Sequence, residues 1–94
     1  MNPPCFAVVF NEGEYMYYVY ILFCSDKRTY IGSTKDLKDR IKRHQLGYIP
    51  ATKKRLPIKL VAYFAFRSES TARNFEQYLK SGSGRAFLKK HEMI

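Results

Sequence analysis

Two polar side chains with catalytic potential, Arg40 and His44, stand four residues apart in the chain. On an α-helix this spacing places both on one face, one turn apart. Leu37 and Ile41 fall on that face or at its edge, so the two groups would border the stripe that faces the core. A guanidinium can stabilise charge on a phosphate, and an imidazole can carry a proton. Taken alone, Arg40 has an ordinary alternative as a surface residue with a buried stem.

A carboxylate on a second helical pattern is the next candidate. Glu76 follows Phe75 and lies between Ala72 and Leu79, on the apolar side of that pattern. Burying an ionised carboxylate is costly unless a cation or strong donors compensate it. Two interpretations stay open for Glu76: a structural ion pair with a lysine or arginine, and a metal ligand or general acid or base.

Tyrosines are concentrated in the first third of the chain. If a hairpin closes around residues 25–28, Tyr20 and Tyr30 come near each other across its two strands. Packing between aromatic side chains is the ordinary role for such a pair. Their hydroxyl groups need partners when buried, and a polar site would supply them.

The strands that must carry these tyrosines follow from runs of β-branched and aromatic residues. Such runs are typical of buried strands when turn residues bound them. Strands are predicted at residues 17–24, 29–32 and 59–66. Between the last two strands lies a basic loop, which Pro57 interrupts.

The helices follow from apolar spacing and from capping residues. Ser33 or Thr34 is predicted to cap the first helix, with Asp36 in its first turn, where a negative charge suits the helix dipole. Ser68 is predicted to cap the second helix, and the Gly-Ser stretch 81–84 should separate it from a short last helix. Helices are predicted at residues 35–46, 69–80 and 85–91.

The resulting order is β-β-α-β-α-α, an α/β (α+β) fold with a three-stranded, mainly antiparallel sheet flanked by helices. The chain has the size of one domain, which we assign to residues 16–94. Residues 1–15 contain adjacent prolines and two glutamates. We expect them to form a flexible N-terminal extension, with Met16 as the biological start.

The charge balance favours a polyanionic partner. Lys and Arg number 17 against 8 for Asp and Glu, which gives a net charge of +9. Nucleic acid is the commonest partner of this kind, because phosphate contacts release condensed counterions. A membrane partner is disfavoured, since no apolar run approaches the ~20 residues that a span requires. Without a convincing signal peptide the protein is expected in the cytoplasm.

Cysteine and glycine patterns exclude other classes of site. Cys5 and Cys24 are far apart and outside any Cys-x-x-Cys pair, so neither a disulfide framework nor a zinc site is indicated. The glycines match neither a P-loop nor a dinucleotide-binding fingerprint, and no small-molecule cofactor is expected. The segment 80–85 could cradle a phosphate at the start of the last helix, but the signal is weak, since a Gly-Ser break between two helices is the ordinary explanation.

Taken together, these residues resemble the GIY-YIG nuclease family, especially small single-domain bacterial members related to the N-terminal domain of excinuclease C. The likeness covers about residues 16–90. The first motif departs from the family name, because Tyr-Val-Tyr stands where Gly-Ile-Tyr is expected. The residues that carry the resemblance are Tyr18-Val19-Tyr20, Tyr30-Ile31-Gly32, Arg40, His44, Thr52-Lys53, Arg55-Leu56-Pro57, Glu76 and the stretch from Tyr78 to Arg85.

This resemblance implies a metal-dependent endonuclease that hydrolyses phosphodiester bonds in DNA. Glu76 would be the sole protein ligand of one Mg²⁺ or Mn²⁺ ion. Tyr20 would act as general base toward the attacking water, with Tyr30 sharing or orienting the proton. Arg40 would stabilise the transition state, and His44 would carry a proton or position Tyr20. All five side chains are then expected to converge on one electropositive cleft.

A basic surface should hold the DNA beside this site. The chain carries no separate DNA-recognition domain, so we expect a targeting protein partner. The runner-up function is a non-catalytic nucleic-acid-binding module of the same fold. A protein adaptor using the aromatic strand 17–23 explains neither the charge nor Glu76. The predicted nucleic-acid-binding residues are Lys35, Lys53, Lys54, Arg55, Lys80 and Arg85.

Overall fold

The structure is a computed structural model that describes residues 16–94, so the expectations for residues 1–15 lie outside it. Its element order, β-β-α-β-α-α, confirms the predicted α+β fold, with one added 3₁₀ turn. The sheet has the order β2-β1-β3, and both pairings are antiparallel. Its strands are β1 (Tyr17–Cys24), β2 (Thr29–Thr34) and β3 (Ile58–Phe66).

The central strand β1 is buried on both faces, which explains its nearly continuous apolar sequence. Val19 and Ile21 point to one face, where they form a core with residues of the two helices that follow β3 in the sequence. Tyr20 and Leu22 point to the opposite face and pack there with a second cluster. Side chains that alternate along one strand therefore build two separate cores.

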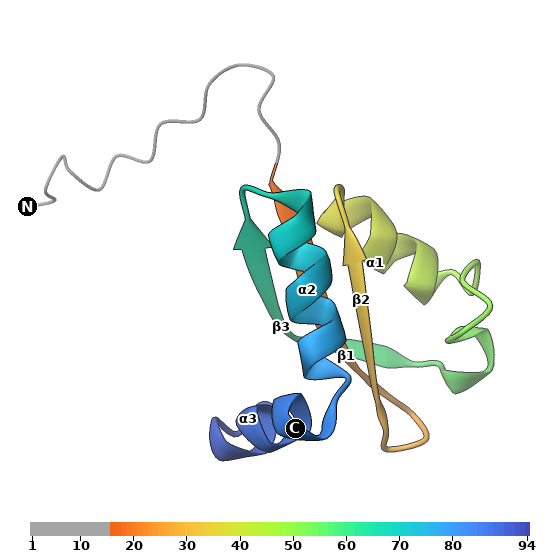
Figure 1. The fold of residues 1–94 in the computed structure, drawn as a ribbon. Coiled ribbons are helices and arrows are strands. Elements are labelled where there is room, and N and C mark those ends of the chain that lie inside the picture. The colour runs from red at the N-terminus through yellow and green to blue at the C-terminus, as the bar shows by residue number, and fades with distance from the viewer. Residues whose placement is uncertain (1–15) are drawn as a thin grey trace, which may run out of the picture.

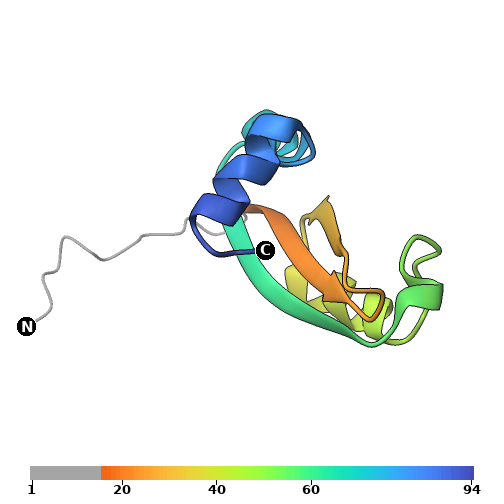
Figure 2. The ribbon, with the colours of Figure 1, turned by 90° about the horizontal axis from the view of Figure 1, so that it is seen from below.

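Helices cover both faces of this sheet, which gives three layers (Figures 1 and 2). The helices α2 (Glu69–Leu79) and α3 (Gly82–Lys90) pack on the face that carries Val19. On the other face lie α1 (Leu37–Gln45) and the loop that contains the 3₁₀ turn η2 (Lys53–Arg55). No helix within residues 16–94 is long and apolar enough to cross a membrane.

The start of α1 differs from the prediction. Asp36 is the N-cap, and its side chain accepts a hydrogen bond from the Asp39 N–H at 3.0 Å. The predicted caps, Ser33 and Thr34, belong instead to β2, which runs two residues further than expected. Asp is as good an N-cap as Ser, and extending β2 leaves the Ser33 hydroxyl free for a contact described below.

The last helix begins earlier than predicted, at Gly82 instead of Arg85. Ser81 caps it by accepting a hydrogen bond from the Gly84 N–H at 3.2 Å. The two glycines therefore form the first turn of α3, and the break between α2 and α3 is short. A Cβ at Gly84 would collide with the backbone of Tyr78 and Leu79, so this glycine lets the two helices meet closely.

Candidate active site

A buried chain of hydrogen bonds connects β1, α1 and the loop before η2. The Tyr20 hydroxyl lies 2.8 Å from His44 Nε2, and His44 Nδ1 lies 2.6 Å from Thr52 Oγ1. All three residues are fully buried. Buried polar groups are retained at a cost unless they are paired, and here each is paired with its neighbour. The imidazole thus links a strand tyrosine to a loop threonine.

Tyr30 completes the aromatic part of the cluster. Its ring centroid lies 6.3 Å from that of Tyr20 and 5.3 Å from that of His44. In the antiparallel register Tyr20 is opposite Gly32 and Leu22 is opposite Tyr30, so the two tyrosines are diagonal neighbours on one face. A Cβ at Gly32 would lie 2.5 Å from the Tyr20 hydroxyl oxygen. A residue without a side chain is therefore needed opposite Tyr20.

The charge states of this cluster are set by burial. Burial and the neighbouring Tyr30 raise the pKa of Tyr20 from 10.0 to about 12, although the Arg40 guanidinium opposes the shift. Burial, followed by the charge of Arg40, lowers the pKa of His44 below its usual 6.5. At neutral pH both Tyr20 and His44 are therefore uncharged, and Arg40 supplies the positive charge beside them.

Glu76 on α2 is held by two donors. The Ser33 hydroxyl donates to its Oε1 at 2.7 Å, and Lys80 Nζ donates to its Oε2 at 2.8 Å. Burial opposes ionisation of Glu76, but these bonds outweigh it and leave its pKa below the ordinary value. The ion pair that was one of the two open interpretations is therefore present. This ion pair is only partly shielded from solvent, since 47% of the Lys80 side chain is exposed.

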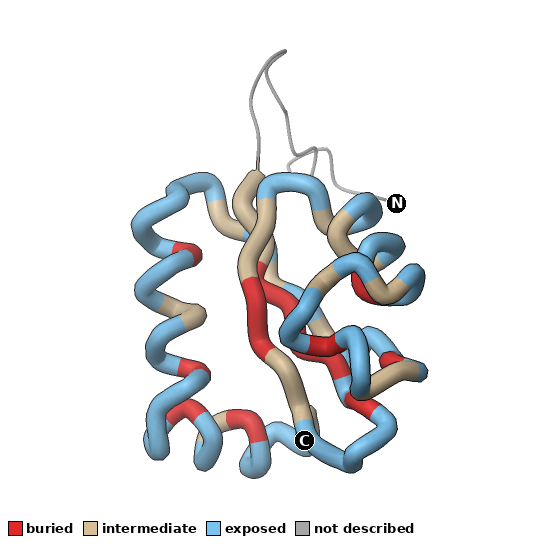
Figure 3. Tube along the Cα trace, turned by 90° about the vertical axis from the view of Figure 1, so that its right-hand side faces the viewer, coloured by how far each residue is buried: buried red, intermediate tan, exposed pale blue. Residues whose placement is uncertain are grey.

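The five residues expected in one cleft are divided by the edge strand β2. Tyr20, Tyr30 and His44 lie together on the face that α1 covers. Glu76 lies on α2, which packs on the opposite face, and its carboxylate reaches Ser33 on β2. Figure 3 shows β2 between α2 and α1. Glu76 nevertheless contributes to raising the pKa of Tyr20, so the two groups interact electrostatically around this edge.

The donor set at Glu76 fits a weakly held divalent cation. Within residues 16–94 no group of three or more His, Cys, Asp and Glu side chains could hold a metal together. Mg²⁺ often binds through one or two carboxylates, keeps several waters and takes phosphate oxygens as further ligands. An ionised Glu76 at the sheet edge suits that mode of binding. A cation there would share the carboxylate with the Ser33 hydroxyl and the Lys80 ammonium group, or displace Lys80 from Oε2.

The predicted DNA-binding residues occupy different environments. Lys53 and Lys54 are exposed on η2, directly after Thr52. Arg55 instead pairs with Asp26 at 2.6 Å and so ties η2 to the β1–β2 turn. Lys80 is paired with Glu76, Lys35 lies over the Tyr17 ring and Arg85 is exposed on α3.

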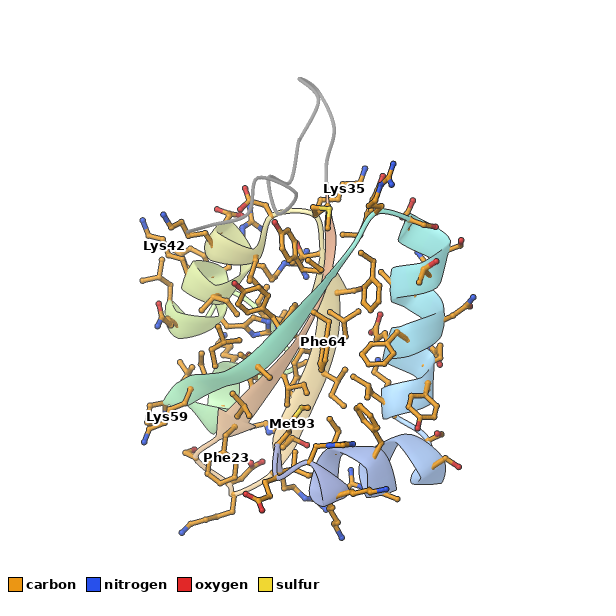
Figure 4. All side chains as sticks on the ribbon, turned by 90° about the vertical axis from the view of Figure 1, so that its left-hand side faces the viewer. Phe23, Lys35, Lys42, Lys59, Phe64 and Met93 are labelled. Atoms are coloured by element: carbon orange, nitrogen blue, oxygen red, sulfur yellow. The ribbon has the colours of Figure 1, made fainter. Side chains whose placement is uncertain are left out.

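An open groove lies elsewhere, between α1 and β3. It has a volume of about 1210 Å³, and its lining includes Tyr18, Ile41 and Tyr63 together with three lysines. Lys35 and Lys42, two of these lysines, are labelled in Figure 4. The groove includes none of Tyr20, Tyr30 and Glu76. Its apolar lining indicates a surface distinct from the tyrosine cluster.

Two residues of the site, Thr52 and Ser33, were not predicted to belong to it, although Thr52 is part of the family resemblance. Thr52 belongs to a basic loop, and nothing in its spacing indicates that its hydroxyl reaches His44. Ser33 suits a helix cap, yet its hydroxyl binds Glu76 across 43 positions of sequence. Both contacts depend on tertiary packing, which local patterns do not encode.

Comparison with known proteins identifies a family and several relatives of this chain. The GIY-YIG catalytic domain matches residues 16–90. The UPF0213 protein in the ldhD 5'-region of Pediococcus acidilactici is 34% identical over 80 residues, 82% of each chain. UPF0213 protein SAG0778 of Streptococcus agalactiae is 37% identical, over 80% of this chain and 90% of that protein.

A solved structure is similar as well. The solution NMR structure of UPF0213 protein BH0048 from Bacillus halodurans has a TM-score of 0.52 and 38% identity, over 80% of this chain and 83% of that one. The strand motifs around Tyr20 and Tyr30 and the helical residues Arg40, His44 and Glu76 lie within the matched domain. This chain therefore belongs to the GIY-YIG family and is similar to its small UPF0213 members.

Proposed function

We propose that this chain is a metal-dependent endonuclease that hydrolyses phosphodiester bonds in DNA. Its GIY-YIG domain belongs to a family of nucleases. The observation that carries the proposal is the fully buried Tyr20 on the central strand β1, whose hydroxyl is held by His44 near Arg40. Glu76 reaches the neighbouring edge strand β2 through Ser33. Burying polar groups costs stability. Titratable groups held in such unfavourable surroundings are typical of functional sites, which supports a catalytic role here.

In the proposed mechanism the protein's own residues bind and orient the reacting groups. Tyr20 accepts the proton of the attacking water, with Tyr30 beside it to share or orient that proton. Arg40 stabilises the negative charge that develops on the phosphate. A divalent cation, when bound at Glu76, would polarise the phosphate and lower the pKa of water.

The raised pKa of Tyr20 is the main energetic obstacle to this mechanism. A pKa of about 12 means that ionising Tyr20 at neutral pH costs about 7 kcal/mol. Arg40 already lowers this cost, and Glu76 adds to it. A cation that neutralises Glu76 removes the second contribution. Activity should therefore depend on the metal and increase with pH.

A non-catalytic DNA-binding module of the same fold is the second candidate. The Lys80 ammonium group already satisfies one oxygen of Glu76, as expected of a structural ion pair. In that case the positive surface, including Lys53 and Lys54, would bind phosphates without cleavage. Under either candidate, a partner protein would supply the choice of target.

Replacing Glu76 by glutamine separates the two candidates. Glu69→Gln is the matched control, because Glu69 lies on the same helix and forms an i,i+4 ion pair with Arg73 at 2.9 Å. We expect Glu76→Gln to reduce Mg²⁺- or Mn²⁺-dependent cleavage roughly 100-fold or more, while DNA affinity stays equal or rises slightly. Glu69→Gln should cleave like the wild type. Equal cleavage by both variants would exclude Glu76 as the metal ligand.

A further inference from the structure

His44 is hydrogen-bonded through both ring nitrogens, and its protonation pattern decides what it can do. A neutral imidazole carries one proton, either on Nδ1 or on Nε2. With the proton on Nδ1, His44 donates to Thr52 and accepts from the Tyr20 hydroxyl. With the proton on Nε2, it donates to Tyr20 and accepts from Thr52.

The Thr52 hydroxyl favours the second arrangement. Thr52 Oγ1 is fully buried, and within residues 16–94 its one hydrogen-bond partner is His44 Nδ1, at 2.6 Å. If Nδ1 carried the proton, the hydroxyl hydrogen of Thr52 would be buried without an acceptor, which is unfavourable. If Thr52 donates to Nδ1, both groups of this bond are satisfied.

The lengths of the two hydrogen bonds favour the same arrangement. When Nε2 carries the proton, the Tyr20 hydroxyl hydrogen loses His44 as its acceptor, and Tyr20 is as fully buried as Thr52, so burial alone does not decide between the two arrangements. The 2.6 Å contact of Thr52 is shorter than N–H···O bonds usually are and suits a hydroxyl donor, whereas the 2.8 Å contact of Tyr20 lies within the N–H···O range. Arg40, which lies beside Tyr20, has only donors. The positive charge of Arg40 near Tyr20 favours the tyrosine oxygen as a hydrogen-bond acceptor.

We propose that Thr52 is a positioning residue that fixes His44 with its proton on Nε2, so that His44 donates a hydrogen bond to Tyr20. The consequence for catalysis rests on the proposed nuclease function. In this tautomer His44 does not take the Tyr20 proton; it stabilises the tyrosinate, together with Arg40. Of the two roles open to His44, positioning of Tyr20 is thereby selected over proton carriage.

The tautomer can be measured directly by ¹⁵N NMR of the histidine side chains in the full chain at neutral pH. His91, the other histidine, is assigned by comparison with a His91→Gln variant. We expect the His44 signals of a protonated Nε2 and an unprotonated Nδ1. A protonated Nδ1 would overturn the proposal whether or not the protein cleaves DNA, so this readout is independent of the nuclease function.

Two substitutions at Thr52 then test its role. Thr52→Val keeps the shape but removes the hydroxyl, and we expect it to shift His44 toward protonation on Nδ1 and to slow cleavage roughly 10- to 100-fold. Thr52→Ser keeps the donor and should retain the Nε2 proton and most activity. A Thr52→Val variant with an unchanged tautomer would contradict the proposal. If that variant does not fold, the His44 tautomer in the wild type and in Thr52→Ser still tests the proposal, because both are expected to carry the proton on Nε2.

Discussion

At the scale of single residues, Tyr20 combines two opposed properties. It is buried against His44 and Tyr30, which fixes its hydroxyl in place. The same burial raises its pKa to about 12, which makes the tyrosinate scarce. A positioned but weakly ionised base is useful only when nearby positive charge favours its ionisation. Arg40 provides part of that charge in the structure.

This pKa predicts a steep dependence of cleavage on pH. Below its pKa the ionised fraction of Tyr20 falls roughly tenfold per pH unit, so the rate should rise by about that factor per unit between about pH 7 and pH 9. Folding must be followed in parallel, because a raised tyrosine pKa gives stability that is lost as pH rises from 10.0 through about 12. A flat profile of single-turnover rates in intact protein would argue against Tyr20 as the base.

Gly32 should matter more for activity than its small size implies. In Gly32→Ala the added Cβ would lie 2.5 Å from the Tyr20 hydroxyl oxygen, so the tyrosine or β2 must move. We expect a loss of about 1–3 kcal/mol in stability and at least about a 100-fold loss of cleavage, since small misplacements are costly in catalysis. Thermal melting and cleavage assays measure the two effects.

A double variant isolates the cause of this loss. Adding Tyr20→Phe removes the hydroxyl that the new Cβ meets, although the ring carbon Cζ remains at 2.7 Å. The stability loss of Gly32→Ala should therefore be smaller in a Tyr20→Phe background. Identical losses in both backgrounds would show that the strand, and not the contact with Tyr20, is sensitive to the substitution.

At the scale of elements, the sequence predicts the strands and helices well and their beginnings less well. β1 agrees at both ends, because its apolar run is bounded by turn residues. The start of α1 was misassigned because Ser33, Thr34 and Asp36 are all good caps, and only the pairing of β2 decides among them. Competing local signals of equal strength need tertiary context to resolve them.

The junction of α2 and α3 provides a test at this scale. A Cβ at Gly84 would overlap the backbone of Tyr78 and Leu79, whereas one at Gly82 would meet nothing within 4 Å. We expect Gly84→Ala to reduce the free energy of unfolding by about 1–3 kcal/mol or more. Gly82→Ala, in the same turn, should be neutral or slightly stabilising. Chemical denaturation measures the free energy of unfolding of both variants, and equal values would contradict this prediction.

At the scale of the whole molecule, the site is assembled around one edge of the sheet. Spacing within a helix shows which residues share a face, as for Arg40 and His44, which both lie on α1. It does not show which side of the sheet the helix will cover. Glu76 consequently approaches β2 from the face opposite Tyr20. Candidate catalytic residues can be proposed from the sequence, but the contacts of Ser33 and Thr52 and the division of the site by β2 require the fold.

The positive surface should control DNA binding in a salt-dependent way. Lys53 and Lys54 are exposed beside the loop that holds His44, so each alanine variant should weaken binding and lower the slope of log affinity against log salt by about 0.9. Lys59→Ala on β3, the opposite edge strand, serves as control (Figure 4). Equal effects of all three substitutions would indicate that binding is spread evenly over the molecule.

The most direct test of metal-dependent DNA cleavage is an assay of the full chain on duplex, flap, branched and single-stranded DNA. We predict that at least one substrate is cut with Mn²⁺, that a chelator abolishes the cut, and that Tyr20→Phe slows it roughly 100-fold or more. Protein that binds these DNAs without cutting any of them would contradict the account. So would cleavage that persists unchanged in Tyr20→Phe.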